Sequence, residues 1–79
     1  MTIDINKFKE AIEFGSDIEF RYKNKNYTIL PWTDEGIVIG LQNSDDDSKF
    51  KSADELIDNY TIDGNKMRDI IGDIEILLM

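Results

Sequence analysis

The side chains of this chain that could do chemistry are carboxylates. The 79 residues include 17 Asp and Glu but no His and no Cys. Without Cys there are no disulfides, thiolate metal sites or thiol nucleophiles, and without His the usual general base at neutral pH is missing. Paired carboxylates catalyse proton transfer only at a fixed separation inside a cleft, for which so short a chain offers little room. The isolated Gly36 and Gly40 form no phosphate-binding loop. The composition therefore predicts a protein that is not an enzyme.

One group of oxygen-bearing side chains has the spacing of a calcium-binding loop. Asn43, Asp45, Asp47 and Asp54 fall at positions 1, 3, 5 and 12 when counted from the first of them. The pattern is incomplete, because Ser48 stands where the turn needs glycine and Asp54 stands where a bidentate Glu is usual. Two interpretations stay open: a solvated loop that keeps the domain soluble, or a weak divalent-cation site. No other cofactor is expected.

The acidic charge is concentrated in one part of the chain. Residues 1–31 hold five acidic and five basic residues, and residues 32–79 carry the whole net charge of −8. A row of carboxylates on a rigid element can imitate nucleic-acid phosphates and bind a basic protein surface, whereas nucleic acid itself is repelled. The alternative is that the charge serves solubility alone. The candidate acidic residues for partner binding are Asp45, Asp46, Asp47, Asp54, Glu55 and Asp58.

Trp32 is the aromatic candidate for partner binding. It follows Pro31 and precedes a polar turn, and tryptophan is enriched in the hot spots of protein interfaces. The alternative is that Trp32 caps the open end of the hydrophobic core. Most of the other large aromatic residues are expected in that core, because aromatic side chains dominate burial in small domains.

The elements that must position these residues follow from the hydrophobic periodicity. Apolar residues recur at helical spacing over residues 5–14, between Asp4 as the N-terminal cap and Gly15 as the C-terminal cap. Alternating apolar residues then predict a strand at 17–23. β-Branched and aromatic residues predict a return strand at 27–30, which ends at Pro31 or lies at a sheet edge, and a segment that is apolar on both faces predicts a third strand at 37–41.

Short helices are expected after residue 51. Ser52 and Glu55 have the spacing of a capping box and predict the start of the first helix. The apolar tail of residues 74–79 fits either a helix or a strand. The sequence thus predicts one α+β domain over residues 1–79, with an N-terminal helix, a three-stranded antiparallel β-meander and short C-terminal helices.

The sequence also predicts where the protein acts. No run of 18 apolar residues could span a membrane, and the N-terminus lacks the basic and apolar regions of a signal peptide. We therefore expect a cytoplasmic protein.

The hairpin and the segments after it resemble small uncharacterised proteins of low-GC Gram-positive bacteria and their phages. In those proteins a hairpin like residues 17–29 is followed by a Trp or Tyr and a strand. A short helix like residues 54–57 comes next, and then an I-D-G segment like residues 62–67. These motifs are structural, so the resemblance implies a fold more than a function.

In size, acidity and lack of catalytic residues the chain also resembles phage-encoded anti-CRISPR proteins, which inhibit Cas nucleases by binding them. This second resemblance is one of character and implies no site residues. It leads to the hypothesis of a non-enzymatic phage or mobile-element protein that acts in the bacterial host cell. Its expected partner is a nucleic-acid-handling protein with a basic surface, with type II Cas9 as the first candidate. The alternative is a small accessory domain that self-associates through its tail, and the sequence leaves monomer and homodimer both open.

Overall fold

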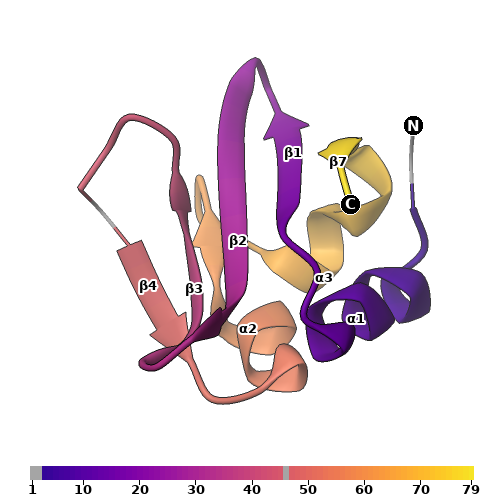
Figure 1. Ribbon diagram of the computed structural model, residues 1–79. Coiled ribbons are helices and arrows are strands. Elements are labelled where there is room, and N and C mark those ends of the chain that lie inside the picture. The colour runs from indigo at the N-terminus through magenta and orange to yellow at the C-terminus, as the bar shows by residue number, and fades with distance from the viewer. Residues whose placement is uncertain (1–2, 46) are drawn as a thin grey trace.

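The computed structural model describes residues 3–45 and 47–79 and confirms the α+β architecture (Figure 1). The helices are α1 (Ile5–Phe14), α2 (Ala53–Asn59) and α3 (Met67–Ile70), and a 3-10 turn (Ile71–Asp73) continues α3. The strands are β1 (Ile18–Tyr22), β2 (Lys25–Thr33), β3 (Gly36–Leu41), β4 (Asp47–Phe50), β5 (Thr61–Ile62), β6 (Asn65–Lys66) and β7 (Glu75–Leu78). The N-terminal helix and the short C-terminal helices lie where the periodicity predicts them.

The main sheet has five antiparallel strands in the order β4-β3-β2-β1-β7, so the predicted three-stranded meander is too small. One missing strand is β4: its first two residues belong to the predicted polar loop of residues 42–48, and the sequence predicts no strand for the other two. Its side chains alternate between half-buried Ser48 and Phe50 and exposed Asp47 and Lys49. An edge strand with one face in water needs few apolar residues, so hydrophobicity alone did not reveal it.

The other missing strand is β7, at the opposite edge of the sheet. Ile76 pairs with Phe20 of β1 and is buried, whereas its neighbours Glu75 and Leu77 are exposed. This alternation settles the open question about the tail in favour of a strand. The sheet therefore brings the C-terminal residues against a strand that lies more than fifty positions earlier in the chain.

Strand β2 continues through Pro31, although the sequence predicts that the strand ends there or lies at an edge. Strand β2 is an interior strand between β1 and β3. The register with β3 shifts between Leu30 and Thr33, and the pairing with β1 stops at Ile29. Pro31 lies inside that irregularity, where its missing N–H interrupts no regular ladder.

The caps that the sequence predicts are present. The Asp4 side chain accepts a hydrogen bond from the Lys7 backbone N–H at 2.9 Å, and Gly15 ends α1 in the left-handed conformation. Ser52 accepts from the Glu55 backbone N–H at 3.1 Å at the start of α2. Both helices are too short to be stable alone, so the caps fix where each begins while packing holds it in place.

The helices group on one side of the sheet, and the core lies between the two (Figure 1). Ile18, Ile29 and Ile39 form a row across β1, β2 and β3, and each is fully buried. The opposite face of the sheet is polar around Gln42, whose side-chain amide donates to Glu19 and Thr28 at 2.8 Å each. The fold thus has one covered face and one face in solvent.

Gly36 gives a test of the β2–β3 turn. Its φ is +102°, and a Cβ there would lie 2.7 Å from the Phe50 carbonyl oxygen. Gly36→Ala combines backbone strain with a clash against β4, so we expect the free energy of unfolding in urea to fall by about 2 kcal/mol or more. Gly64→Ala is the matched control, because its φ is +82° and its Cβ would meet nothing within 4 Å. The control should cost about 1 kcal/mol, and equal losses for both variants would contradict the close contact.

Candidate functional site

The acidic candidates fall on two separate elements. Asp45 precedes β4 and Asp47 begins it, while Asp54, Glu55 and Asp58 lie on α2. In Figure 1 the loop before β4 and the helix α2 lie at opposite ends of that strand. The candidate Asp46 lies outside the described residues. Each of the five described candidates is exposed to solvent.

The four residues with calcium-loop spacing do not share one loop. Strand β4 spans four residues at about 3.3 Å each, so it carries the chain away from Asn43, Asp45 and Asp47 before α2, which holds Asp54, begins at Ala53. Within residues 3–45 and 47–79, no three His, Cys, Asp or Glu side chains gather closely enough to hold a metal ion. The structure therefore places Asp54 on a different element from the other three predicted ligands.

Two carboxylates of α2 have basic partners from other helices. Asp54 forms an ion pair with Lys9 of α1 at 2.9 Å, and Asp58 forms one with Arg68 of α3 at 2.9 Å. The hydrogen bond and charge of Asp54 raise the pKa of Lys9, with smaller contributions from Glu13 and Asp58. All of these side chains are solvent-exposed or nearly so, and exposed ion pairs exchange readily for others. The α2 carboxylates are thus held in place but remain accessible to a competing cation.

A rigid base supports these carboxylates. Ala53, Leu56 and Ile57 of α2 are buried in the core, and they alternate with the exposed acids at helical spacing. The helix makes contacts with α1, α3 and β4. The acids therefore project from an element that packing keeps fixed.

Trp32 lies at the surface, with 63% of its area exposed. Its indole Nε1 donates a hydrogen bond to the carboxylate Oδ1 of Asp17, in the segment between α1 and β1. This bond holds the indole against the loop while leaving most of the ring in water. An exposed aromatic side chain in a fixed orientation has the properties of an interface anchor.

Phe14 is an exposed aromatic residue that the sequence reasoning missed. Its side chain is 91% exposed, although most of the aromatic residues are expected in the core. The missed signal is its helical phase, because Phe14 follows the buried Ile12 by two positions and so faces away from the core.

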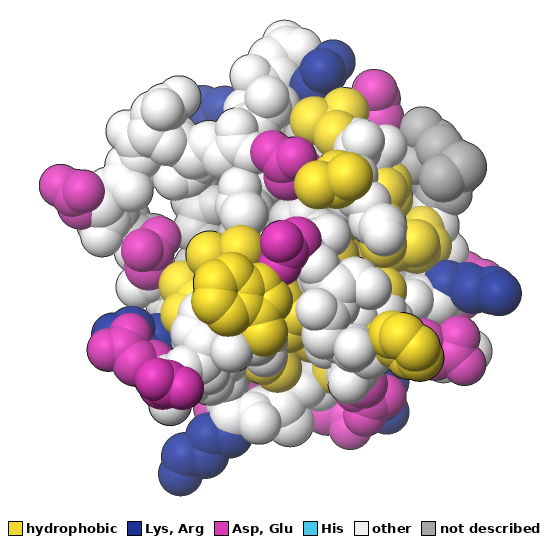
Figure 2. Space-filling model, viewed as in Figure 1, with side chains coloured by type: hydrophobic (Ala, Val, Ile, Leu, Met, Phe, Trp, Pro, Cys, Tyr) yellow, Lys and Arg dark blue, Asp and Glu magenta, His cyan; other side chains and the backbone are white. Residues whose placement is uncertain are grey.

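Figure 2, viewed as in Figure 1, shows acidic side chains bordering exposed hydrophobic ones over the lower part of the sheet.

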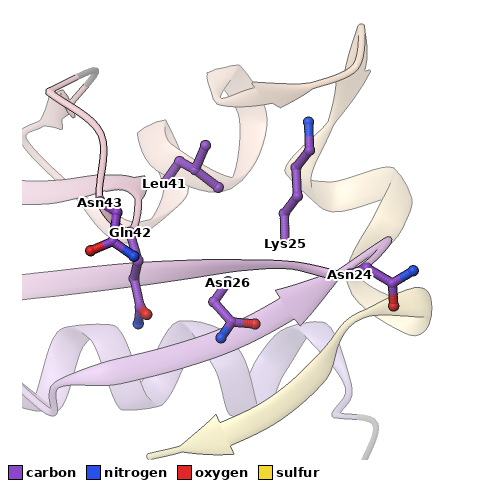
Figure 3. Close-up of a pocket in the computed structure, with 6 residues that line it drawn as sticks. All are labelled: Asn24, Lys25, Asn26, Leu41, Gln42 and Asn43. Atoms are coloured by element: carbon purple, nitrogen blue, oxygen red, sulfur yellow. The ribbon is translucent and has the colours of Figure 1, made fainter.

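A shallow hollow of about 300 Å³ lies at the other end of the sheet (Figure 3). It is lined by Asn24, Lys25, Asn26, Leu41, Gln42 and Asn43. The close-up shows Lys25 and Leu41 extending to one side, Asn26 and Gln42 to the other, and Asn24 away from both. Amide groups neither accept nor release a proton at neutral pH, and these side chains do not converge on one point.

The chain was compared with known proteins, and it matches no family model, no curated protein and no solved structure. In the part of the chain that the structure describes, no helix is both long and apolar enough to cross a membrane.

The bond between Trp32 and Asp17 can be tested with the intrinsic fluorescence of the protein, because Trp32 is its only tryptophan. Asp17→Ala removes the acceptor and should lower the steady-state fluorescence anisotropy of the indole. Asp17→Asn retains an acceptor oxygen and is the matched control, with an anisotropy close to that of the wild-type protein. An unchanged anisotropy in the Asp17→Ala variant would show that the carboxylate does not hold the ring.

Proposed function

We propose that this protein is a non-enzymatic phage or mobile-element protein that binds and inhibits a nucleic-acid-handling protein of its bacterial host, in the host cytoplasm. The observation that carries the proposal is the set of exposed carboxylates on α2, a helix fixed by its buried face. If these carboxylates served solubility alone, a solvated loop would hold them equally well. Carboxylates on a packed helix add a fixed spacing, which is what recognition of a basic surface needs.

The proposed mechanism is exchange of ion pairs. Within the protein Asp54 pairs with Lys9 and Asp58 pairs with Arg68. An exposed ion pair of this kind contributes about 0–1 kcal/mol to the stability of the fold. Arg and Lys side chains of a partner can replace these intramolecular cations at small cost. Glu55, beside Asp54 on the first turn of α2, adds a third carboxylate. Together they would occupy a surface on which the partner normally binds phosphates.

Type II Cas9 is the first partner to test. It holds its guide–target duplex in a positively charged channel and recognises that duplex through its backbone. A compact acidic domain could compete for such a channel without contacting nucleic acid. The likeness in size and acidity to anti-CRISPR proteins supports this choice, although it assigns no residues.

The test is a DNA cleavage assay with purified Cas9, guide RNA and increasing concentrations of this protein. The wild-type protein should inhibit cleavage, and the inhibition should weaken as salt concentration rises. A variant with Glu55→Lys and Asp58→Lys should need at least about tenfold more protein for half-maximal inhibition, because like charges would then face the basic channel.

A second double variant controls for net charge. Asp69→Lys with Asp73→Lys makes the same change in charge at two other exposed positions. This control should inhibit as the wild-type protein does, and circular dichroism should show that both variants are folded. Full cleavage at a large molar excess of the wild-type protein would falsify the choice of Cas9. Equal loss in both variants would contradict a role for α2.

Self-association is the second candidate function, and the edge position of β7 favours it. Leu77, Leu78 and Met79 are 40%, 50% and 46% exposed, and β7 pairs with β1 on one side only within the five-stranded sheet. Edge strands with exposed apolar side chains are templates for pairing with another strand. Two copies could join antiparallel through β7 about a two-fold axis.

Light scattering coupled to size-exclusion chromatography tests this candidate. If β7 mediates a dimer, the wild-type mass should be twice that of the monomer, and Leu78→Lys should restore the monomer by placing a charge at the contact. Thr61→Lys is the control and should leave the mass unchanged, because it places the same charge at an exposed position of β5, outside the five-stranded sheet. A monomeric wild-type protein at high concentration would exclude the dimer.

A further inference from the structure

Asp17 is held in place by a neutral hydrogen-bond donor. Its Oδ1 accepts the hydrogen bond from the indole Nε1 of Trp32, and its side chain is exposed to solvent. Within residues 3–45 and 47–79, no ion pair involves Asp17, and the pairs that Lys and Arg form go to Glu35, Asp54, Asp58 and Glu75. A neutral donor fixes the position of a carboxylate but does not cancel its charge. Asp17 therefore presents a negative charge to solvent in a fixed position.

The same hydrogen bond positions the ring of Trp32. The indole N–H lies in the plane of the ring, so the bond places the Asp17 carboxylate beside the edge of the ring and leaves the faces uncovered. Trp32 is 63% exposed, so its ring is open to a partner. The face of a tryptophan attracts cations, and a carboxylate has lone pairs for more than one hydrogen bond. The two side chains thus offer two kinds of attraction to one cation.

An arginine side chain fits this pair of residues better than a lysine. The guanidinium is planar and carries five N–H donors, so it can stack on an aromatic ring while it donates to a carboxylate at the edge of that ring. The lysine ammonium is a compact and strongly hydrated point charge, and it gains less from the face of a ring.

The arginine must come from another protein. The two arginines of this chain, Arg21 and Arg68, pair with Glu75 at 4.0 Å and with Asp58 at 2.9 Å. A second copy would have to give up one of these pairs while approaching a molecule that carries the same net charge of −8. A partner with a basic surface meets neither obstacle.

We propose that Trp32 and Asp17 bind an arginine side chain on the surface of a partner protein. The inference deepens the proposed function and rests on it, because it names a residue type on the basic partner and a contact of this protein that lies outside α2. Stacking on the indole adds a preference that charge alone does not supply, since Lys and Arg carry the same charge.

The single tryptophan reports on this site directly, because Trp32 itself makes the contact. The probe is a peptide of alternating Arg and Gly, titrated in about 0.15 M salt so that distant exposed charges are screened. It should change the Trp32 emission in a saturable way and bind at least about fivefold more tightly than the same peptide with Lys in place of Arg. No saturable change, or equal affinities for the two peptides, overturns the proposal.

Two matched variants separate the charge of Asp17 from the net charge of the protein. Asp17→Asn keeps an acceptor for the indole N–H but removes the charge, so it should weaken binding of the Arg peptide at least about fivefold. Asp63→Asn removes the same charge from an exposed residue of the β5–β6 turn, where Asn also tolerates the positive φ of +54°. This control should bind as the wild-type protein does. Equal losses in both variants overturn the assignment to Asp17.

Variants of Trp32 test the stacking, with isothermal titration calorimetry as the readout because the fluorophore is removed. Trp32→Leu keeps an apolar side chain without an aromatic face and should weaken binding of the Arg peptide at least about fivefold. Trp32→Phe retains such a face and should bind more tightly than Trp32→Leu. Circular dichroism should show that both variants are folded. Wild-type affinity in Trp32→Leu overturns the role of the ring.

The cleavage assay distinguishes a failure of this inference from a failure of the proposed function. If Asp17→Asn inhibits Cas9 as the wild-type protein does while the charge reversal on α2 does not, the arginine site is wrong and the proposed function stands. If the Arg peptide binds as expected but the wild-type protein leaves Cas9 active, the arginine site stands and Cas9 is the wrong partner.

Discussion

The packing of Phe20 is the interaction on which the rest of the fold depends. Phe20 is fully buried at the centre of β1, where it pairs with Tyr27 of β2 on one side and Ile76 of β7 on the other. Its ring stacks on Tyr27 with centroids 5.2 Å apart and meets the edge of Phe8 from α1 at 6.2 Å. Truncation of such a buried Phe costs about 3–5 kcal/mol, a large share of the stability of any small domain. One side chain therefore joins the first helix, the central hairpin and the C-terminal strand.

That arrangement also explains why the helical acids are exposed. Three short helices must cover one face of a five-stranded sheet, so each turns its apolar residues inward and its charged residues outward.

Tyr27, stacked on Phe20, is buried as part of the same core, and burial raises the pKa of its hydroxyl. Ionisation of that hydroxyl is favoured in the unfolded chain, so this residue contributes stability below its ordinary pKa and loses that contribution at alkaline pH.

The sequence predicts the parts of the fold that depend on interactions between residues close together in the chain. Asp4, Gly15 and Ser52 act within one helical turn of their own positions, so their caps are readable from residue type and spacing. Long-range pairing decides the rest. The polar Asp47–Phe50 becomes β4 because β3 offers it a partner, and the tail becomes β7 because β1 does. Neither partnership is encoded in the periodicity of the segment itself.

The same distinction applies to the candidate site. Clustering of acids along the chain is visible in the sequence, but it does not reveal that Lys9 and Arg68 neutralise Asp54 and Asp58 across helix contacts. It also overlooks Phe14, which the end of α1 directs into solvent. Charge alone attracts a broad class of basic proteins, because surface electrostatics mainly sets the rate of encounter. Selective binding requires desolvated apolar contacts in addition to that attraction, and exposed side chains such as Phe14 and Trp32 are able to provide them.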